Sequence, residues 1–104
     1  MILVTEELEK LMADHPLYSH QDDEDPLMLV KFFNPCGAGT WYACEYSPED
    51  TIAFGYVTGL GGDELGHFSL NELRLLKLPY GLTIERDEHF TPCRLSEIKS
   101  GDRQ

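Results

Sequence analysis

Three segments rich in aromatic and β-branched residues constrain the fold of this chain more than any other feature. They span Met28–Phe33, Thr40–Tyr46 and Ile52–Val57, and turn-forming Asn-Pro, Gly and Ser-Pro residues separate them. Such runs are typical of strands, and the short connections favour an antiparallel meander. Because Leu29 and Phe33 add apolar side chains to the second face of the first strand, part of that face is expected to be covered.

Two segments have the marks of amphipathic helices. The first is predicted over Thr5–Asp14, where a threonine followed by two glutamates suits a helix start. In it, Leu8, Leu11 and Met12 form one apolar stripe. The stretch Ser69–Glu72 matches a capping box, in which the serine and glutamate side chains satisfy backbone amides at a helix start. A second helix is therefore predicted to begin at that serine.

Together these elements predict an α+β fold in a single domain that covers residues 1–104. We expect an antiparallel sheet of four to five strands with the two helices packed on one face. Short strands are expected at Leu65–Phe68 and Leu82–Glu85, and a helical turn at Ser96–Lys99. The predicted core residues are Leu11, Phe32, Trp41, Phe54, Tyr56 and Leu73.

The charge of the chain excludes several classes of function. Its 19 acidic and 8 basic residues give a net charge of −11, and residues 1–73 hold 14 acids but only two bases, Lys10 and Lys31. Such a surface repels phosphates, so nucleic acid is not expected as a direct ligand. The charge excess by itself is explained by solubility, and it also suits attraction of a basic protein partner. No apolar run is long enough to span a membrane, and three cysteines at no recognised spacing fit reduced thiols in the cytoplasm.

No catalytic or metal-binding motif stands out in the sequence. It has neither a Cys-x-x-Cys nor a His-Glu-x-x-His pattern, so no metal, no cofactor and no enzymatic activity are expected. In an extended strand Glu85, Asp87 and His89 would share one face, as an acid–base or cation site requires. A charged edge strand that resists aggregation is the preferred interpretation of this stretch.

A run of four acidic residues is the strongest candidate for a partner-binding site. Mimicry of a whole duplex is excluded, because a domain about 33 Å across would face roughly 20 phosphates, more than the net charge supplies. A local acidic patch stays open, in which this loop meets a second acidic loop, at Asp63 or at Glu49. The candidate partner-binding residues are Asp22, Asp23, Glu24, Asp25, Asp63 and Glu64.

Segments spread over the whole chain carry a resemblance to a known family. They are residues 30–35, 40–43, 53–55, 64–73 and 81–92, with the sequences VKFFNP, TWYA, AFG, ELGHFSLNEL and GLTIERDEHFTP. In these segments the chain resembles a family of small proteins, filed as a domain of unknown function, that plasmids, phages and integrative elements of bacteria carry. The resemblance extends to a type II-A anti-CRISPR protein, an inhibitor of Cas9.

The resemblance implies a mobile-element accessory protein that acts by binding. The expected partner is a basic nucleic-acid-handling protein of host defence, most specifically Cas9 or its guide-RNA complex. Two alternatives stay open: an anti-restriction or plasmid-maintenance factor with another protein target, and a small metal-binding protein or enzyme that uses Glu85, Asp87 and His89. A monomer is expected because the acid-rich surface opposes self-association, although apolar residues on both strand faces keep a dimer open.

Overall fold

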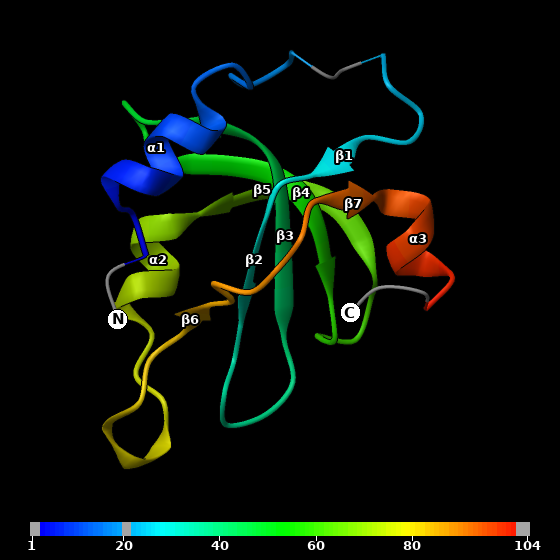
Figure 1. Cartoon of the computed structure of the whole chain (residues 1–104). Helices are drawn as coiled ribbons and strands as arrows, with labels where there is room; N and C mark the ends of the chain where they lie inside the picture. Colours follow the sequence, from blue (N-terminus) through cyan, green and yellow to red (C-terminus); the bar gives the residue numbers. More distant parts are fainter. Residues whose placement is uncertain (1–2, 20–21, 102–104) are drawn as a thin grey trace.

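Five antiparallel strands form the centre of the structure. The computed structural model describes residues 3–19 and 22–101 (Figure 1). Its main sheet has the strand order β5-β4-β3-β2-β6, and β1 pairs separately with β7 as a two-stranded antiparallel ladder. The predicted α+β fold is therefore confirmed. The elements are α1 (Glu6–Met12), β1 (Leu27–Met28), β2 (Val30–Phe33), β3 (Thr40–Ser47), β4 (Ile52–Thr58), β5 (Glu64–Ser69), α2 (Leu70–Leu75), the 3-10 helix η1 (Pro79–Gly81), β6 (Glu85–Arg86), β7 (Cys93–Arg94) and α3 (Leu95–Lys99).

The three aromatic segments provide the central strands, as expected. A β-bulge interrupts the pairing of β3 with β4, because Ala43 pairs with Gly55 while Glu45 pairs with the residue before it, Phe54. Cys44 is the extra residue. Next to the bulge the two strands approach so closely that a Cβ atom on Gly55 would lie 1.7 Å from the backbone oxygen of Tyr42. Glycine is therefore required at this position in β4.

Helices α1 and α2 cover one face of the sheet. Both helix starts are capped as predicted, since the Thr5 hydroxyl accepts a hydrogen bond from the Leu8 N–H at 3.1 Å. The Ser69 hydroxyl likewise accepts from the Glu72 N–H at 3.2 Å. Apolar side chains of both helices pack with the sheet in one cluster, which we call the first-face cluster. It includes Leu8, Met12, Phe32, Trp41, Leu70, Leu73 and Ile84.

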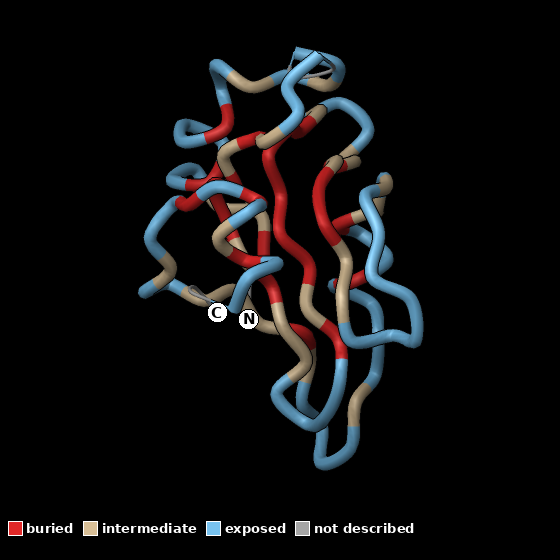
Figure 2. The backbone as a smooth tube through the Cα atoms, turned by 90° about the vertical axis from the view of Figure 1, so that its right-hand side faces the viewer, coloured by how far each residue is buried: buried red, intermediate tan, exposed pale blue. Residues whose placement is uncertain are grey.

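The opposite face is covered by α3 together with the β1–β7 ladder. This second-face cluster comprises Met28, Tyr42, Cys44, Tyr56, Cys93, Leu95 and Ile98. The expectation that part of the second face is covered is confirmed, and it explains the apolar residues on both faces of the central strands. Figure 2 shows the buried positions along these strands, with the exposed positions in the turns and loops around them.

Two expectations about particular residues are wrong. The strand predicted at Leu82–Glu85 does not form, because Leu82 exchanges turn hydrogen bonds with Leu78 and Pro79, and β6 covers Glu85–Arg86 instead. Leu11 is 39% exposed. Successive residues of a helix are about 100° apart, so Leu11 lies on the flank of α1 rather than on the inner face that Leu8 and Met12 share.

The other core predictions hold with one exception. Phe32, Trp41, Tyr56 and Leu73 are buried, whereas Phe54 is half-buried beside a surface pocket. In the described residues no disulfide joins the three cysteines, of which Cys36 is exposed and the other two are buried. In the part of the chain that the structure describes, no helix is long and apolar enough to cross a bilayer.

Candidate functional site

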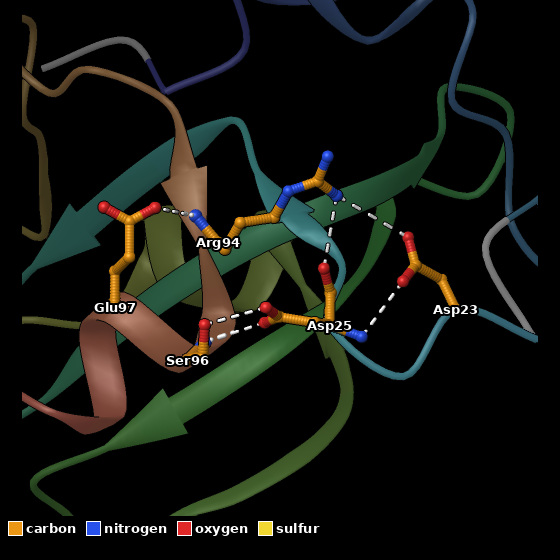
Figure 3. Close-up of polar contacts among 5 residues, drawn as sticks. All are labelled: Asp23, Asp25, Arg94, Ser96 and Glu97. Carbon is orange, nitrogen blue, oxygen red and sulfur yellow. Dashed lines mark hydrogen bonds and ion pairs between the residues drawn. The ribbon is translucent and has the colours of Figure 1, made fainter.

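The acidic loop, residues Asp22–Asp25, lies between α1 and β1 and is attached to the start of α3. The Asp25 carboxylate accepts two hydrogen bonds from Ser96, one from its N–H at 2.8 Å and one from its hydroxyl at 2.7 Å (Figure 3). Ser96 is in the first turn of α3, where backbone amides have no partner inside the helix. Asp25 therefore fixes the acidic loop by capping a helix from the other end of the chain.

Asp23 and Arg94 complete this attachment (Figure 3). Arg94 donates a hydrogen bond to the backbone oxygen of Asp25 at 3.2 Å, and its guanidinium lies 3.9 Å from the Asp23 carboxylate. The Asp23 carboxylate also accepts from the Asp25 N–H at 2.9 Å. Two of the four acidic side chains thus stabilise the loop, while Asp22 and Glu24 are exposed. Among the described contacts that hold the loop, none uses these two side chains.

The contact between Asp25 and Ser96 predicts a dependence of stability on pH. Hydrogen bonds from the Ser96 hydroxyl and then from its N–H lower the pKa of Asp25 below the ordinary value of 3.8. A carboxyl group whose pKa falls on folding stabilises the folded protein above its ordinary pKa, and that contribution is lost as the pH falls through the lowered value. We expect Asp25→Asn to lower the unfolding temperature at neutral pH, and the difference from the original protein to close below about pH 4.

Thermal unfolding followed by circular dichroism, from neutral pH to about pH 2, measures this difference. Asp22→Asn is the matched control, because the Asp22 side chain is exposed and its replacement removes the same charge. A difference between Asp25→Asn and the original protein that stays constant over the whole range would contradict the assigned role of the carboxylate.

The other two candidate residues, Asp63 and Glu64, lie away from the acidic loop. The Asp63 carboxylate closes the β4–β5 turn by accepting from the Thr58 hydroxyl at 2.7 Å and from the Gly59 N–H at 3.3 Å. Figure 1 shows the acidic loop above the sheet and this turn at the lower end of the strands. The six predicted residues therefore do not form one continuous patch.

A pocket separates the acidic loop from the edge of the sheet. Its volume is 230 Å³, and we call it the aromatic–acidic pocket; its walls include Tyr18, Asp23, Glu45, Phe54, Leu65 and His67. The rings of Phe54 and His67 lie 4.9 Å apart between centroids, and those of Tyr18 and His67 lie 6.0 Å apart. The pocket thus combines ring surfaces with carboxylates, an arrangement suited to a side chain that is both cationic and partly apolar.

Glu45 is the residue of this pocket that sequence reasoning missed. It is 3% exposed, and its carboxylate accepts a hydrogen bond from the Tyr18 N–H at 2.8 Å. An acidic residue in a strand would ordinarily be assigned to the solvent side. The bulge at Cys44 shifts the pairing and turns this side chain inward. The signal in the sequence is the pair Cys44-Glu45, which breaks the alternation of apolar and polar residues along β3.

Burial disfavours the reactive thiolate form of Cys44 beside this pocket. Burial, followed by the nearby Glu45 carboxylate, raises the pKa of Cys44 to about 12. Its sulfur also lies 3.4 Å from the backbone oxygen of Phe54. A thiol in this environment is protonated at neutral pH, which makes it a poor nucleophile.

The second titratable stretch borders a different, shallow pocket of 430 Å³. Because β6 ends at Arg86, His89 lies in the turn that follows, and its N–H donates to the Asp87 carboxylate at 3.0 Å. The predicted alternation of Glu85, Asp87 and His89 along one strand therefore does not extend to the histidine. In the described ranges, no group of three His, Cys, Asp or Glu side chains is placed to hold a metal ion.

Two charged residues of this stretch, Arg86 and Asp87, form ion pairs with residues on other elements. The Lys31 ammonium lies 3.8 Å from the Asp87 carboxylate, and Arg86 donates to the Glu7 carboxylate of α1 at 2.9 Å. These contacts join β6 to β2 and to α1. The arrangement favours a stabilising role for the charged residues over an acid–base site.

Comparison with known proteins gives one match. A family model described as "Protein of unknown function (DUF2958)" matches residues 2–100. No curated protein and no solved structure matches the chain.

Proposed function

Because the chain belongs to the DUF2958 family, whose function is unknown, we propose that it acts by binding a basic nucleic-acid-handling protein and inhibiting it. The observation that carries the proposal is the attached acidic loop, in which Asp23 and Asp25 fix the backbone while Asp22 and Glu24 face solvent. A loop already held in one conformation loses little entropy when a partner binds. Carboxylates at its tip attract positively charged surfaces and repel nucleic acid.

The proposed target is a host-defence nucleoprotein, most specifically type II Cas9 or its guide-RNA complex. Such an enzyme holds nucleic acid in a positively charged channel, which an acidic protein can occupy. The sequence resemblance to small proteins of mobile genetic elements supports this target, and so does the net charge of −11. We propose that the chain works as a monomer in the bacterial cytoplasm. An anti-restriction or plasmid-maintenance target would use the same surface.

The test is a titration of the purified protein into a Cas9 cleavage assay, at low and at high salt. The protein is added either before or after guide loading. Inhibition that saturates near one equivalent and weakens with salt supports the proposal. No inhibition in either order, with Cas9 enzymes from several sources, rejects Cas9 as the target; affinity capture with the same two salt conditions then tests other basic proteins.

Neutralising the two exposed carboxylates should weaken this inhibition without unfolding the protein. We expect the double variant Asp22→Asn and Glu24→Gln to bind about tenfold more weakly and with a smaller salt dependence, because solvent-exposed charges attract a partner over a distance of about one Debye length. The matched control is Glu6→Gln with Asp14→Asn, which removes the same charge from exposed positions in and just after α1. Equal inhibition by the two double variants would show that the acidic loop is not the contact surface.

A further inference from the structure

Strand β5 is a long and unprotected edge of the main sheet. It covers six residues, Glu64–Ser69, whereas the strand at the opposite edge, β6, covers two. On its inner side β5 pairs with β4, and no strand in the described part of the chain pairs with its outer side. Every second residue of such a strand points its backbone N–H and C=O groups outward, where they can pair with another extended chain.

The sequence of β5 has few of the features that block such pairing. Edge strands are commonly protected by lysine, proline or a bulge. The segment Glu-Leu-Gly-His-Phe-Ser has one charged residue, Glu64, and no proline. Its pairing with β4 is continuous over six residues, from Glu64 to Ser69, with no bulge. The edge is therefore regular enough to accept an additional strand.

A pocket lies on each face of this edge. Leu65 and His67 border the aromatic–acidic pocket, which contains the carboxylates of Asp23 and Glu45. Glu64 and Phe68 border a second pocket of 390 Å³ on the other face, which we call the Trp41 pocket because the indole forms one wall. Successive side chains of an added strand point to opposite faces of the sheet, so alternate residues would enter the two pockets in turn.

The chemistry of the two pockets defines the occupant. Carboxylates and rings in the aromatic–acidic pocket suit an arginine side chain, which stacks on rings and binds carboxylates through its planar guanidinium. The Trp41 pocket is lined by four apolar side chains, Trp41, Val57, Leu60 and Phe68, beside the polar Glu64 and His67. Its apolar walls suit an aliphatic side chain. A second copy of this chain is a poor occupant, because each copy carries a net charge of −11 and β5 contains no basic residue other than a histidine.

We propose that β5 is a docking edge that accepts an extended segment of the basic partner as an additional antiparallel or parallel strand, with arginine and aliphatic residues alternating along it. This inference rests on the proposed function, because the docked segment belongs to the basic protein partner proposed there. Backbone hydrogen bonds to β5 supply affinity, and the two pockets select the alternating side chains.

The test uses a synthetic hexapeptide that alternates arginine with valine, capped at both ends, and the backbone amide spectrum of the isotopically labelled protein. We expect shifts in residues 64–69 and in Tyr18 and Phe54, and none with the matched hexapeptide that alternates glutamate with valine. The double variant Leu65→Lys and His67→Lys should weaken binding of the arginine peptide about tenfold, through charge repulsion and edge protection.

The matched control for charge is Leu75→Lys with Leu76→Lys, at the exposed C-terminal end of α2, which should bind the peptide as the original protein does. All four positions are exposed, so the variants should fold, and Trp41 fluorescence checks this.

Shifts confined to the acidic loop, or an equal response to both hexapeptides, would overturn the inference. So would a concentration-dependent dimer that the Leu65→Lys and His67→Lys changes abolish, because the occupant would then be a second copy. Binding of the arginine peptide at β5 together with failure of Cas9 inhibition would reject the target alone.

Discussion

Gly55→Ala is expected to destabilise the protein by more than about 4 kcal/mol, close to the whole stability of a small domain. The added methyl group would lie 1.7 Å from the backbone oxygen of Tyr42 and 2.9 Å from the Cα of Ala43. Both obstacles are main-chain atoms of β3, which no rotamer change can move. Relief requires β4 to separate from β3 at the bulge, and this would break the pairing at the centre of the sheet.

The neighbouring glycine provides the control for this prediction. Gly66 of β5 pairs directly with Gly55, yet a Cβ atom there would meet nothing within 4 Å. We expect Gly66→Ala to leave stability unchanged or to raise it slightly, because alanine restricts the unfolded chain more than glycine does. Urea unfolding of both variants, followed by circular dichroism, separates the two cases. Similar stabilities for the two variants would show that β4 does not approach β3 as described.

Phe32→Ala should cost about 3–5 kcal/mol of the free energy of unfolding. Phe32 is 0% exposed and lies at the centre of β2, where it pairs with Trp41 on one side and with Arg86 on the other. Its ring is part of the first-face cluster beneath α1 and α2. Removing it leaves a cavity that the surrounding strands and helices cannot close without losing their own contacts.

Phe33→Ala is the matched comparison, because it deletes the same ring from the next residue. Phe33 is partly exposed and borders the shallow pocket beside β6, so we expect a loss of less than about half as much stability. Chemical denaturation followed by fluorescence of the single tryptophan, Trp41, compares the two variants. Equal losses would show that the two faces of β2 are packed alike.

The fold was predictable wherever local chemistry and tertiary packing agree. The hydroxyls of Thr5 and Ser69 cap their helices as the sequence indicates, since capping depends on residues only three apart. The strand ends near Thr40 and Ile52 follow from turn residues next to them. The strand expected at Leu82–Glu85 fails because Leu82 forms hydrogen bonds within a local turn, with Leu78 and Pro79, and nothing in the composition of the segment distinguishes such a turn from the start of a strand.

The candidate site was predictable only in part, because some of its contacts join residues that are far apart in the sequence. The acidic loop could be found because its four residues are consecutive, but its attachment to Ser96 and Arg94 could not, since these lie near the opposite end. The separation of Asp63 from this loop depends on which end of the strands carries the β4–β5 turn, and this is set by the pairing of β4 with β5. Burial of Glu45 depends on a bulge, which is a property of two paired strands rather than of one segment.

The pairing of β1 with β7 sets the order in which the molecule can be completed during synthesis. The first-face cluster takes its helical residues from α1 and α2 and includes Ile84, all of which precede β7 in the chain. The second face stays open until residues 93–99 emerge, so Tyr42 and Tyr56 meet water or a chaperone before they meet Leu95 and Ile98. A chain that ended before Cys93 would therefore have a covered first face and an exposed apolar second face.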